Sequence, residues 1–370
     1  MVDMCSTMVQ SMDKNVQMVF SAIEKTIVKN IPVLRQEDYK NREYIYYGTD
    51  NLYPEYLFGL YTDVSVLKSV VDGTAGYVAG DDAVCKVPGF ELTMNKKGDT
   101  LRNIIKWCSR DYNLYGGFAL QIVRNLAGKV SEVYYTDFRY LRSDKKNESF
   151  VYNEDFGKRY ARSSKSIVYP KFVPDGDAPA SILYVKNDVT YTYPIPRYSG
   201  AIKACEIERH IDDMHLSSLE NGFMPSYIIN FLNGIPDDSQ KAEIERSVTE
   251  KFCGTENAGR VLLNFANGAE NAATVEKLEV SDFADKYKAA AERSRSTIYE
   301  SMQAIPQLFG NMAASTGFNE VEFKTAWGLF SSTVVRDQQR VIGDAFDKIF
   351  STKGSISITP FVLGDQTNVN

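Results

Sequence analysis

The residue types that most often carry acid–base or metal chemistry are scarce in this chain of 370 residues. Its two histidines, His210 and His215, lie five residues apart in a segment expected to be helical, so their side chains would point roughly 140° apart. A metal-binding pair on one helix face needs a spacing of three or four residues. Asp212 and His215 have that spacing and could share a metal ion. An ordinary solvated or interhelical polar cluster is the far commoner explanation, and no metal site is predicted.

The sequence supports catalysis by a nucleophile or by a carboxylate pair no better than it supports a metal site. A Ser-His-Asp or Cys-His unit would have to use one of the same two histidines. Acid pairs such as Asp81-Asp82 are expected by chance among 48 Asp and Glu residues, and none belongs to a recognisable acid–base arrangement. Asp237-Asp238 is better explained as the start of a helix. The absence of any catalytic motif favours a structural role, and we expect the protein not to be an enzyme.

Glycine-rich segments do not match a phosphate-binding loop, which requires G-x-x-x-x-G-K-[ST] after a strand. Gly73, Gly76 and Gly80 lie in a helical pattern without a lysine. They are better explained as packing or helix-end glycines. The segment from Gly310 to Gly317 also lacks a lysine, so no nucleotide or other cofactor is expected.

The cysteines indicate neither a disulfide framework nor a metal site. Their number is odd and no CxxC pair occurs: they are Cys5, Cys85, Cys108, Cys205 and Cys253. We expect free, mostly buried thiols in a reducing compartment. The chain begins with an acid where a signal peptide needs a basic start, and no apolar run approaches the ~18 residues of a membrane span. Production and use in a cytoplasm, without membrane contact, is therefore expected.

Charge limits the kinds of partner. The formal net charge is −6 and the pI is about 5.3. A protein that grips DNA through its phosphates usually presents a basic domain or stripe, and the chain as a whole shows neither. Contact with nucleic acid should therefore be weak, local or non-adhesive. The 23 Tyr and 20 Phe suit both strands and surfaces covered in an assembly, and both explanations stay open.

The first part of the chain is predicted to be mainly helical. Apolar residues at three- and four-residue steps predict an amphipathic helix over residues 8–28. A helix further on is expected to end at Gly80. Another is expected over about 99–111, with Asp99 or Thr100 as its N-cap.

From Gly116 to Pro196 the pattern changes to short apolar or aromatic runs separated by turns, which predicts a β-rich domain or layer. Residues 118–124 and 130–135 are predicted to form a hairpin. Further strands are expected at 149–152, 166–169, 182–185 and 189–193.

Long helices return further along the chain. Residues 200–222 are predicted to form a helix about 35 Å long. It lacks one clean apolar stripe, which indicates burial against several neighbours. Two strands, 227–232 and 260–265, with a helix 238–252 between them predict a compact β-α-β insert. A second long helix is expected over 281–303.

The last third of the chain combines a break, a loop and one more helix. Ile305-Pro306 is expected to end the second long helix, and the small residues from Gly310 to Asn319 predict a flexible loop. A third helix is predicted over 320–350, kinked near Gly328 and the hydroxyl residues that follow it. One short strand, 355–359, is expected in the tail, and no internal repeat is evident.

Five short stretches occur in an order that one protein family shares. They are Asp50–Pro54 (DNLYP), Asn221–Ile229 (NGFMPSYII), Asn257–Leu263 (NAGRVLL), Ile305–Gly310 (IPQLFG) and Phe318–Glu320 (FNE). Together with the order of the predicted elements, they make the chain resemble the portal proteins of tailed bacteriophages, of the long-tailed, siphovirus-like type. The second stretch is similar to the family's exit from its first stem helix, and the third is similar to its second clip strand.

The resemblance implies an α+β portal fold that forms rings. Two long helices around a small insert cannot bury all their faces in one chain, so rotated neighbours would supply the missing surface. The parts that it implies are a β-rich wing (1–199), two stem helices (200–223 and 279–304), a small β-α-β clip (224–278), a tunnel loop (305–319), a kinked tunnel helix (320–350) and a short tail or reduced crown (351–370).

The resemblance also implies a function. The chain would be a structural subunit of a ring, a dodecamer in assembled virions, through which DNA is packaged and ejected at one capsid vertex. It would assemble in the cytoplasm of a host bacterium. Its partners would be the terminase large subunit, a head-completion or adaptor protein, the major capsid protein and double-stranded DNA held weakly and without sequence preference. An acidic channel wall suits sliding, because it avoids the deep electrostatic wells that phosphate binding creates.

Two sets of site residues are expected from this map. No Lys or Arg lies between Ala304 and Val321, so the tunnel loop could line the channel and touch DNA without gripping it. Its candidate contacts are Gln307, Asn311, Met312, Ser315, Thr316 and Asn319. The clip would meet the packaging motor and later the head-completion proteins through Asp237, Asp238, Lys241, Glu245 and Arg246, which would otherwise be plain solvated surface.

Three other classes of protein fit the sequence less well. Another minor head or connector protein of a phage would lack the stem, clip and stem order. A metal-dependent nucleic-acid enzyme would need a convergent acid or metal site, which titration with divalent metals would reveal. A sequence-specific DNA-binding module is disfavoured by the pI and by the lack of a recognition-helix motif.

Overall fold

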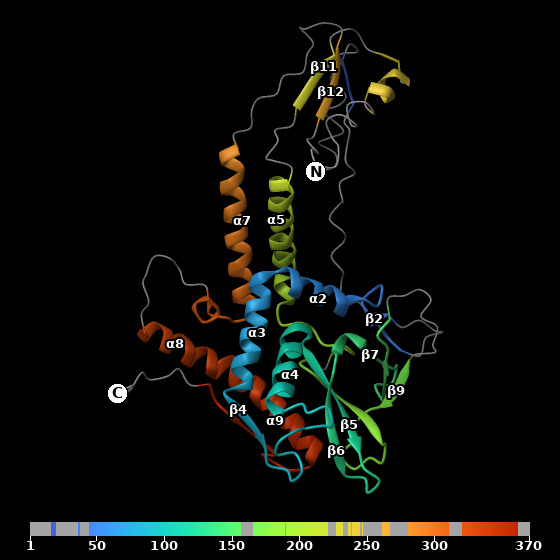
Figure 1. Ribbon diagram of the computed structural model, residues 1–370, viewed down its shortest axis with the longest axis vertical. Helices are drawn as coiled ribbons and strands as arrows, with labels where there is room; N and C mark the ends of the chain where they lie inside the picture. The colour runs from blue at the N-terminus through green and yellow to red at the C-terminus, as the bar shows by residue number, and fades with distance from the viewer. Residues whose placement is uncertain are drawn as a thin grey trace. The chain divides into compact units, whose positions relative to one another are not determined.

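Helices and strands are mixed along the chain in this computed structural model (Figure 1). The structure describes residues 16–19, 36–37, 44–156, 166–188, 190–220, 227–231, 236–237, 239–244, 246, 261–266, 280–310 and 320–361. The chain forms two units, which we call the small unit (residues 1–30 and 210–290) and the large unit (residues 31–209 and 291–370). The mixed helix-and-sheet class expected from the sequence is confirmed.

The described elements of the large unit are distributed over its whole length. Its strands are β2 (Gln36–Glu37), β3 (Tyr46–Tyr47), β4 (Asp82–Cys85), β5 (Gly117–Arg124), β6 (Val130–Thr136), β7 (Leu141–Ser143), β8 (Ser149–Tyr152), β9 (Ile167–Pro170), β10 (Ala180–Lys186) and β13 (Ile356–Thr359). Its helices are α2 (Tyr53–Asp63), α3 (Ser65–Ala79), α4 (Leu101–Tyr115), α8 (Glu320–Phe330) and α9 (Arg336–Phe350). Shorter helical turns are η1 (Phe138–Tyr140), η3 (Ser199–Ala201), η5 (Pro306–Phe309) and the π-helical η6 (Ser331–Val335). Two long helices have residues in both units, α5 (Ile202–Glu220) and α7 (Val280–Ser301).

The ends of α3 and α4 follow local signals in the sequence. α3 ends at Gly80, as predicted, with φ +68. A Cβ at Gly80 would lie 2.1 Å from the backbone oxygen of Thr359, so only glycine fits there. α4 begins after Thr100, whose hydroxyl accepts a hydrogen bond from the N–H of Asn103 at 3.3 Å. Thr100 is therefore the N-cap, one of the two predicted.

Two antiparallel sheets confirm most of the strands predicted between Gly116 and Pro196. One has the order β10-β5-β6 and contains the predicted hairpin, and the other has the order β7-β8-β9. The strand predicted over 189–193 is wrong in its described part. Thr190 donates its N–H to the side chain of Asp188 at 2.7 Å, and the residues after it form bends. This local turn stands where the apolar and aromatic residues predicted a hydrogen-bonded strand.

The helix predicted over residues 8–28 is wrong where the structure describes that segment. Val16–Val19 form strand β1, which pairs antiparallel with β12 (Val261–Ala266), and β12 pairs in parallel with β11 (Tyr227–Phe231). A short apolar segment with β-branched residues fits either periodicity, and the hydrogen bonds that β12 offers decide between them. The parallel pair agrees with the predicted β-α-β order. Residues 1–30 share the small unit with this sheet, whereas the predicted wing includes them.

The predicted long helices are present, with small shifts at their ends. The third one runs through α8, η6 and α9, and the irregularity expected near Gly328 is the π-helical turn η6. Ser332 and Thr333 both donate their hydroxyls to the backbone oxygen of Leu329, at 2.9 and 2.8 Å. Such bonds compete with the regular backbone pattern and favour a local bend.

The C-terminal strand is held by a neighbouring strand and by a carboxylate that binds the residues just before it. β13 pairs antiparallel with β4, a strand that the sequence did not predict. Just before β13, the carboxylate of Asp347 accepts hydrogen bonds from the N–H groups of Gly354 and Ser355 at 2.9 and 2.8 Å. The predicted short strand is confirmed, one residue shorter at its start.

The core of the large unit consists of two clusters of buried side chains. The first includes Leu67 and Val70 of α3, and the second includes Val78 of the same helix. Leu308 belongs to the second cluster, and Phe309 packs against both. Helix α3 therefore spans the junction of the two clusters, and η5 lies at that junction.

Candidate functional site

The candidate site is the base of the predicted tunnel loop, where the chain enters and leaves it. Of the six predicted channel residues, Gln307 is described and lies exposed on η5. The other five, Asn311, Met312, Ser315, Thr316 and Asn319, lie outside the described residues. The structure therefore shows what holds the loop, and the loop's own contacts remain a prediction.

Helix α3 holds the first end of the loop through two backbone oxygens. The hydroxyl of Tyr77 donates to the oxygen of Leu308 at 2.7 Å, and the hydroxyl of Ser69 donates to the oxygen of Phe309 at 3.1 Å. Burial raises the pKa of Tyr77 above its usual value, so this donor stays protonated. Gly310 follows in the left-handed region, with φ +84, and turns the chain into the loop.

Gly73 explains why η5 can sit so close to α3. A Cβ at this position would lie 2.8 Å from the ring of Phe309. The sequence predicts a packing or helix-end glycine here, and the packing role is confirmed. The residue that packs on it could not be named from the sequence, because no local pattern links α3 to η5.

An aromatic cluster joins the two ends of the loop. The ring of Tyr77 lies 5.9 Å from that of Phe309 before the loop, and 4.9 and 6.1 Å from Trp327 and Phe330 on α8 after it. Phe361, beyond β13, lies 5.3 Å from the same ring. Edge-to-face and tilted pairs of this kind add to the burial of their area. One tyrosine of α3 thus anchors both ends of the loop.

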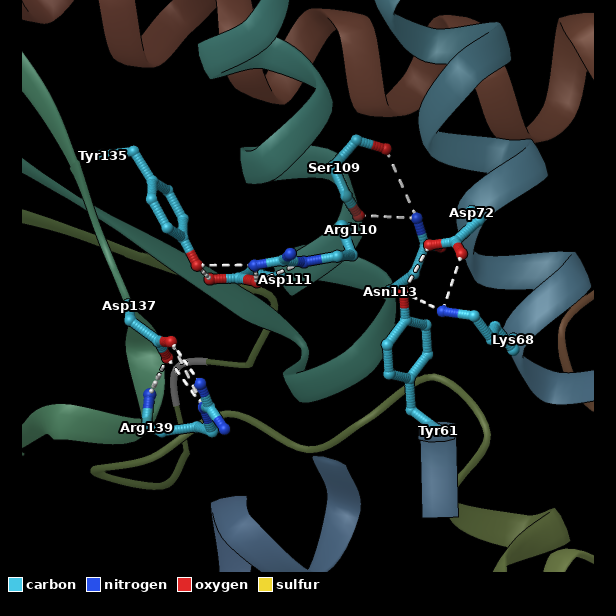
Figure 2. A network of polar contacts seen from close by, with 10 residues as sticks. All are labelled: Tyr61, Lys68, Asp72, Ser109, Arg110, Asp111, Asn113, Tyr135, Asp137 and Arg139. Atoms are coloured by element: carbon cyan, nitrogen blue, oxygen red, sulfur yellow. Dashed lines mark hydrogen bonds and ion pairs between the residues drawn. The ribbon is translucent and has the colours of Figure 1, made fainter. Parts of the chain in front are cut away.

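Helix α9, which continues α8 beyond η6, is fixed to α4 by buried amides. Gln338 and Asn113 exchange hydrogen bonds at 2.8 and 3.0 Å, and the hydroxyl of Ser109 donates to Gln338 at 2.7 Å. All three side chains are buried. Figure 2 shows Ser109 and Asn113 side by side on α4. This contact was not predictable from the sequence, since polar residues in helices ordinarily face water.

A second buried polar cluster in Figure 2 ties α4 to β6. Asp111 accepts a hydrogen bond from the hydroxyl of Tyr135 at 2.8 Å and pairs with Arg110 at 3.1 Å. Burial raises the pKa of Asp111 to about 7, against the opposing effect of Arg110. Its side chain has no exposed area, so no substrate could reach it. The cluster joins α4 to β6 inside the fold.

Two further groups in Figure 2 fix local geometry. Tyr61 of α2 donates to Asp72 of α3 at 2.6 Å, and Lys68 donates to Tyr61 at 3.1 Å. This joins the two helices across their short connection. Arg139 pairs with Asp137 at 2.7 Å around η1.

The predicted clip contacts are described in part. Asp237, Lys241 and Arg246 are described, and Asp238 and Glu245 are not. The carboxylate of Asp237 accepts the N–H of Gln240 at 2.8 Å, which confirms the predicted helix start, and residues 239–244 and 246 are helical. Asp237 and Arg246 are exposed and Lys241 is half-buried. Their role as partner contacts stays a prediction.

The histidines and cysteines lie as follows. His210 is 3.8 Å from Asp213, and both are exposed. Within the described ranges, no group of three or more His, Cys, Asp or Glu residues is placed to hold a metal ion. Cys85, Cys108 and Cys205 are buried, as predicted, and the other two cysteines lie outside these ranges. Among the described helices, none is long and apolar enough to cross a membrane.

Comparisons with known proteins bear on the fold. No protein-family model matches the sequence, and no curated protein matches it. Among solved structures, the chain is similar to one from the neck of the native gene transfer agent particle, computed with C12 symmetry, at 17% identity. The TM-score is 0.52, and 84% of this chain and 85% of that chain are covered. The two chains therefore share their fold.

Two further solved structures are similar. A chain from the neck of the empty gene transfer agent particle, computed with C6 symmetry, matches at 16% identity and TM-score 0.52, over 84% of this chain and 85% of that one. An HK97 family phage portal protein from Corynebacterium diphtheriae matches at 10% identity and TM-score 0.48, over 78% and 88%. The two neck structures confirm, at the level of the fold, that the chain is similar to a protein of a phage-like particle.

Proposed function

We propose that the chain is a structural subunit of a portal ring, the head–tail connector at one capsid vertex, through which double-stranded DNA is packaged and ejected. The observation that carries the proposal is the similarity to a neck chain over more than four fifths of both chains. Because the fold extends along almost the whole length, the likeness is not that of one common small domain. The order of elements predicted from the sequence supports the same conclusion independently.

The proposed ring is a dodecamer of this chain in the virion. The neck structures to which it is similar were computed with C12 and C6 symmetry. α5 exposes Ile207 and Leu216, at 47% and 57% of their residue surface. Apolar side chains exposed on a long helix are expected where a neighbouring subunit covers it.

The proposed channel contact is the loop between η5 and α8, within residues 305–319. Its base is fixed by Tyr77, Ser69 and the packing of Phe309 on Gly73. No Lys or Arg occurs in the loop. A loop with a rigid base and uncharged residues could touch a moving duplex without binding its phosphates.

The proposed partners follow the domain map predicted above. The clip, residues 224–278, would meet the terminase large subunit and then a head-completion or adaptor protein, and exposed Asp237 and Arg246 support a solvent-facing helix there. The wing, residues 1–199, would face the major capsid protein. Assembly would take place in the cytoplasm of the host bacterium, and no enzymatic step is assigned to the chain.

Sedimentation of the purified protein at micromolar concentration tests the proposal. The ring predicts a species many times heavier than the 41.7 kDa chain. A protein that is monomeric in every buffer and also within capsids would contradict it.

A further inference from the structure

Helix α8 is held to the rest of the large unit by few contacts. Among its 11 residues only Phe330, at the last position, is buried. Phe323, Ala326 and Trp327 are half-buried, and the other residues of α8 are exposed. α9, by comparison, has buried residues along its whole length. A helix with so few buried contacts separates from its surroundings at a low cost in free energy.

An irregular turn separates α8 from α9. The chain between them is the π-helical η6, where the hydroxyls of Ser332 and Thr333 donate to the backbone oxygen of Leu329. Turns of this kind interrupt the regular hydrogen bonds of a helix and mark the places where it bends. The position of α8 is therefore not set by α9 alone, and contacts along α8 itself must hold it.

The C-terminal segment supplies one of these contacts. The ring of Phe361 lies 5.4 Å from that of Trp327 on α8 and 5.3 Å from that of Tyr77 on α3. Tyr77 and Trp327 lie 4.9 Å apart, so each of the three rings contacts the other two. Edge-to-face ring pairs stabilise beyond the area that they bury. Phe361 therefore binds α8 and α3 at the same time.

Strand β13 places Phe361 at this point. The backbone oxygen of Thr359, the last residue of β13, accepts the N–H of Asp81 at 3.1 Å. The same oxygen lies so close to Gly80, which ends α3, that a Cβ there would be 2.1 Å away. Pro360 follows and restricts the backbone to a narrow range of φ. Phe361 thus stands two residues beyond a fixed strand end, so little conformational entropy is lost in placing its ring.

We infer that Phe361 is a latch that fixes α8 against α3, and that displacing the C-terminal segment frees α8 to move about η6. The ring is half-buried and lies after the last paired residue of β13, so it can leave while the strand stays paired. The inference concerns contacts within one chain and goes beyond the proposed function, since it holds whether or not the chain forms rings. It gives the C-terminal segment control over the position of one helix.

Hydrogen–deuterium exchange of backbone amides, followed by mass spectrometry on the full chain, tests the latch. In Phe361→Ala, exchange within residues 320–330 should be at least about tenfold faster than in wild type, because both ring contacts are lost. Exchange within residues 336–350 and the melting temperature should stay as in wild type. Phe361→Tyr keeps the ring and should keep the protection of α8. Tyr191→Ala is the matched control, since Tyr191 already exposes 45% of its surface, and should change neither helix.

Two shortened chains separate the ring from the residues that follow it. A chain without residues 362–370 keeps Phe361 and should exchange in α8 like wild type. A chain without residues 361–370 should exchange like Phe361→Ala. If both shortened chains lose protection equally, the residues after Phe361 hold α8, and the assignment of the latch to Phe361 is wrong.

Three further outcomes would overturn the inference. One is equal protection of α8 in Phe361→Ala and wild type, and another is a wild-type α8 without protection, which nothing would then hold in place. The third is a parallel loss of protection in α8 and α9 with a lower melting temperature, because Phe361 would then support the whole core. Native mass measurement gives the oligomeric state of each sample, and samples in the same state are compared. A wild type without rings would contradict the proposed function and leave this comparison intact.

Discussion

Gln338 and Asn113 stand 225 residues apart and exchange two hydrogen bonds between fully buried side-chain amides. The pair joins α9 to α4 and so connects the helix after the proposed channel loop to the β-rich part of the large unit. Buried amides are stabilising only when both partners are present. The contact therefore fixes one relative position of the two helices.

Gln338→Leu should lower the free energy of unfolding by about 2–4 kcal/mol, because it leaves polar atoms of Asn113 and Ser109 buried without a partner. Urea unfolding followed by circular dichroism measures the change. Gln307→Leu, at an exposed position, is the matched control and should change stability by less than about 0.5 kcal/mol. Equal effects of the two variants would mean that the buried amides do not stabilise the fold.

Gly73 and Gly76 provide a matched pair on α3. Alanine at either position should favour the helix by up to about 1 kcal/mol. At Gly76 nothing lies within 4 Å of the new Cβ, whereas at Gly73 it would lie 2.8 Å from Phe309. Gly76→Ala should therefore raise the melting temperature, and Gly73→Ala should lower it relative to Gly76→Ala by displacing η5. The packing account fails if the two variants melt alike.

Asp111 should make stability depend on pH. Burial raises its pKa from 3.8 to about 7 in the folded chain, so between these values the folded state binds more protons than the unfolded state. The free energy of unfolding should then fall as the pH rises from about 4 to about 7. Asp111→Asn cannot titrate, and its stability profile should be flatter than that of wild type over this range. A wild-type slope kept by the variant would show that other groups cause it.

Local signals made much of the fold predictable. The N-cap at Thr100, the helix end at Gly80 and the hairpin of β5 and β6 depend on residues within a few positions of one another, and the structure confirms them. The error at β1 has the opposite cause. Val16 and Val19 fit a helix or a strand equally well. The segment becomes a strand because β12, far along the chain, pairs with it.

The base of the site was only partly predictable for the same reason. Pro306 indicates from the sequence alone that the long helix ends before it. Tyr77 and Ser69 gave no signal, because their hydroxyls act on backbone oxygens of a distant segment. The sequence likewise did not indicate that the polar residues Ser109 and Asn113 of α4 would be buried. Their burial arises only when α9 covers them.

A lysine in the proposed channel loop tests its place near DNA. Ser315→Lys would be repeated in every subunit, and the resulting ring of charges should bind phosphates. Packaging should slow or stall, with a steeper salt dependence, since each neutralised phosphate adds roughly −0.9 to the log–log slope. Ala127→Lys, in the exposed turn between β5 and β6, is the control and should package normally. Wild-type rate and salt response in Ser315→Lys would place the loop outside the channel.

Electron microscopy of the purified full-length chain tests the central claim most directly. The account predicts closed rings whose class averages show rotational symmetry around an open centre. Uniform single-chain particles, or open filaments without closure, would contradict it.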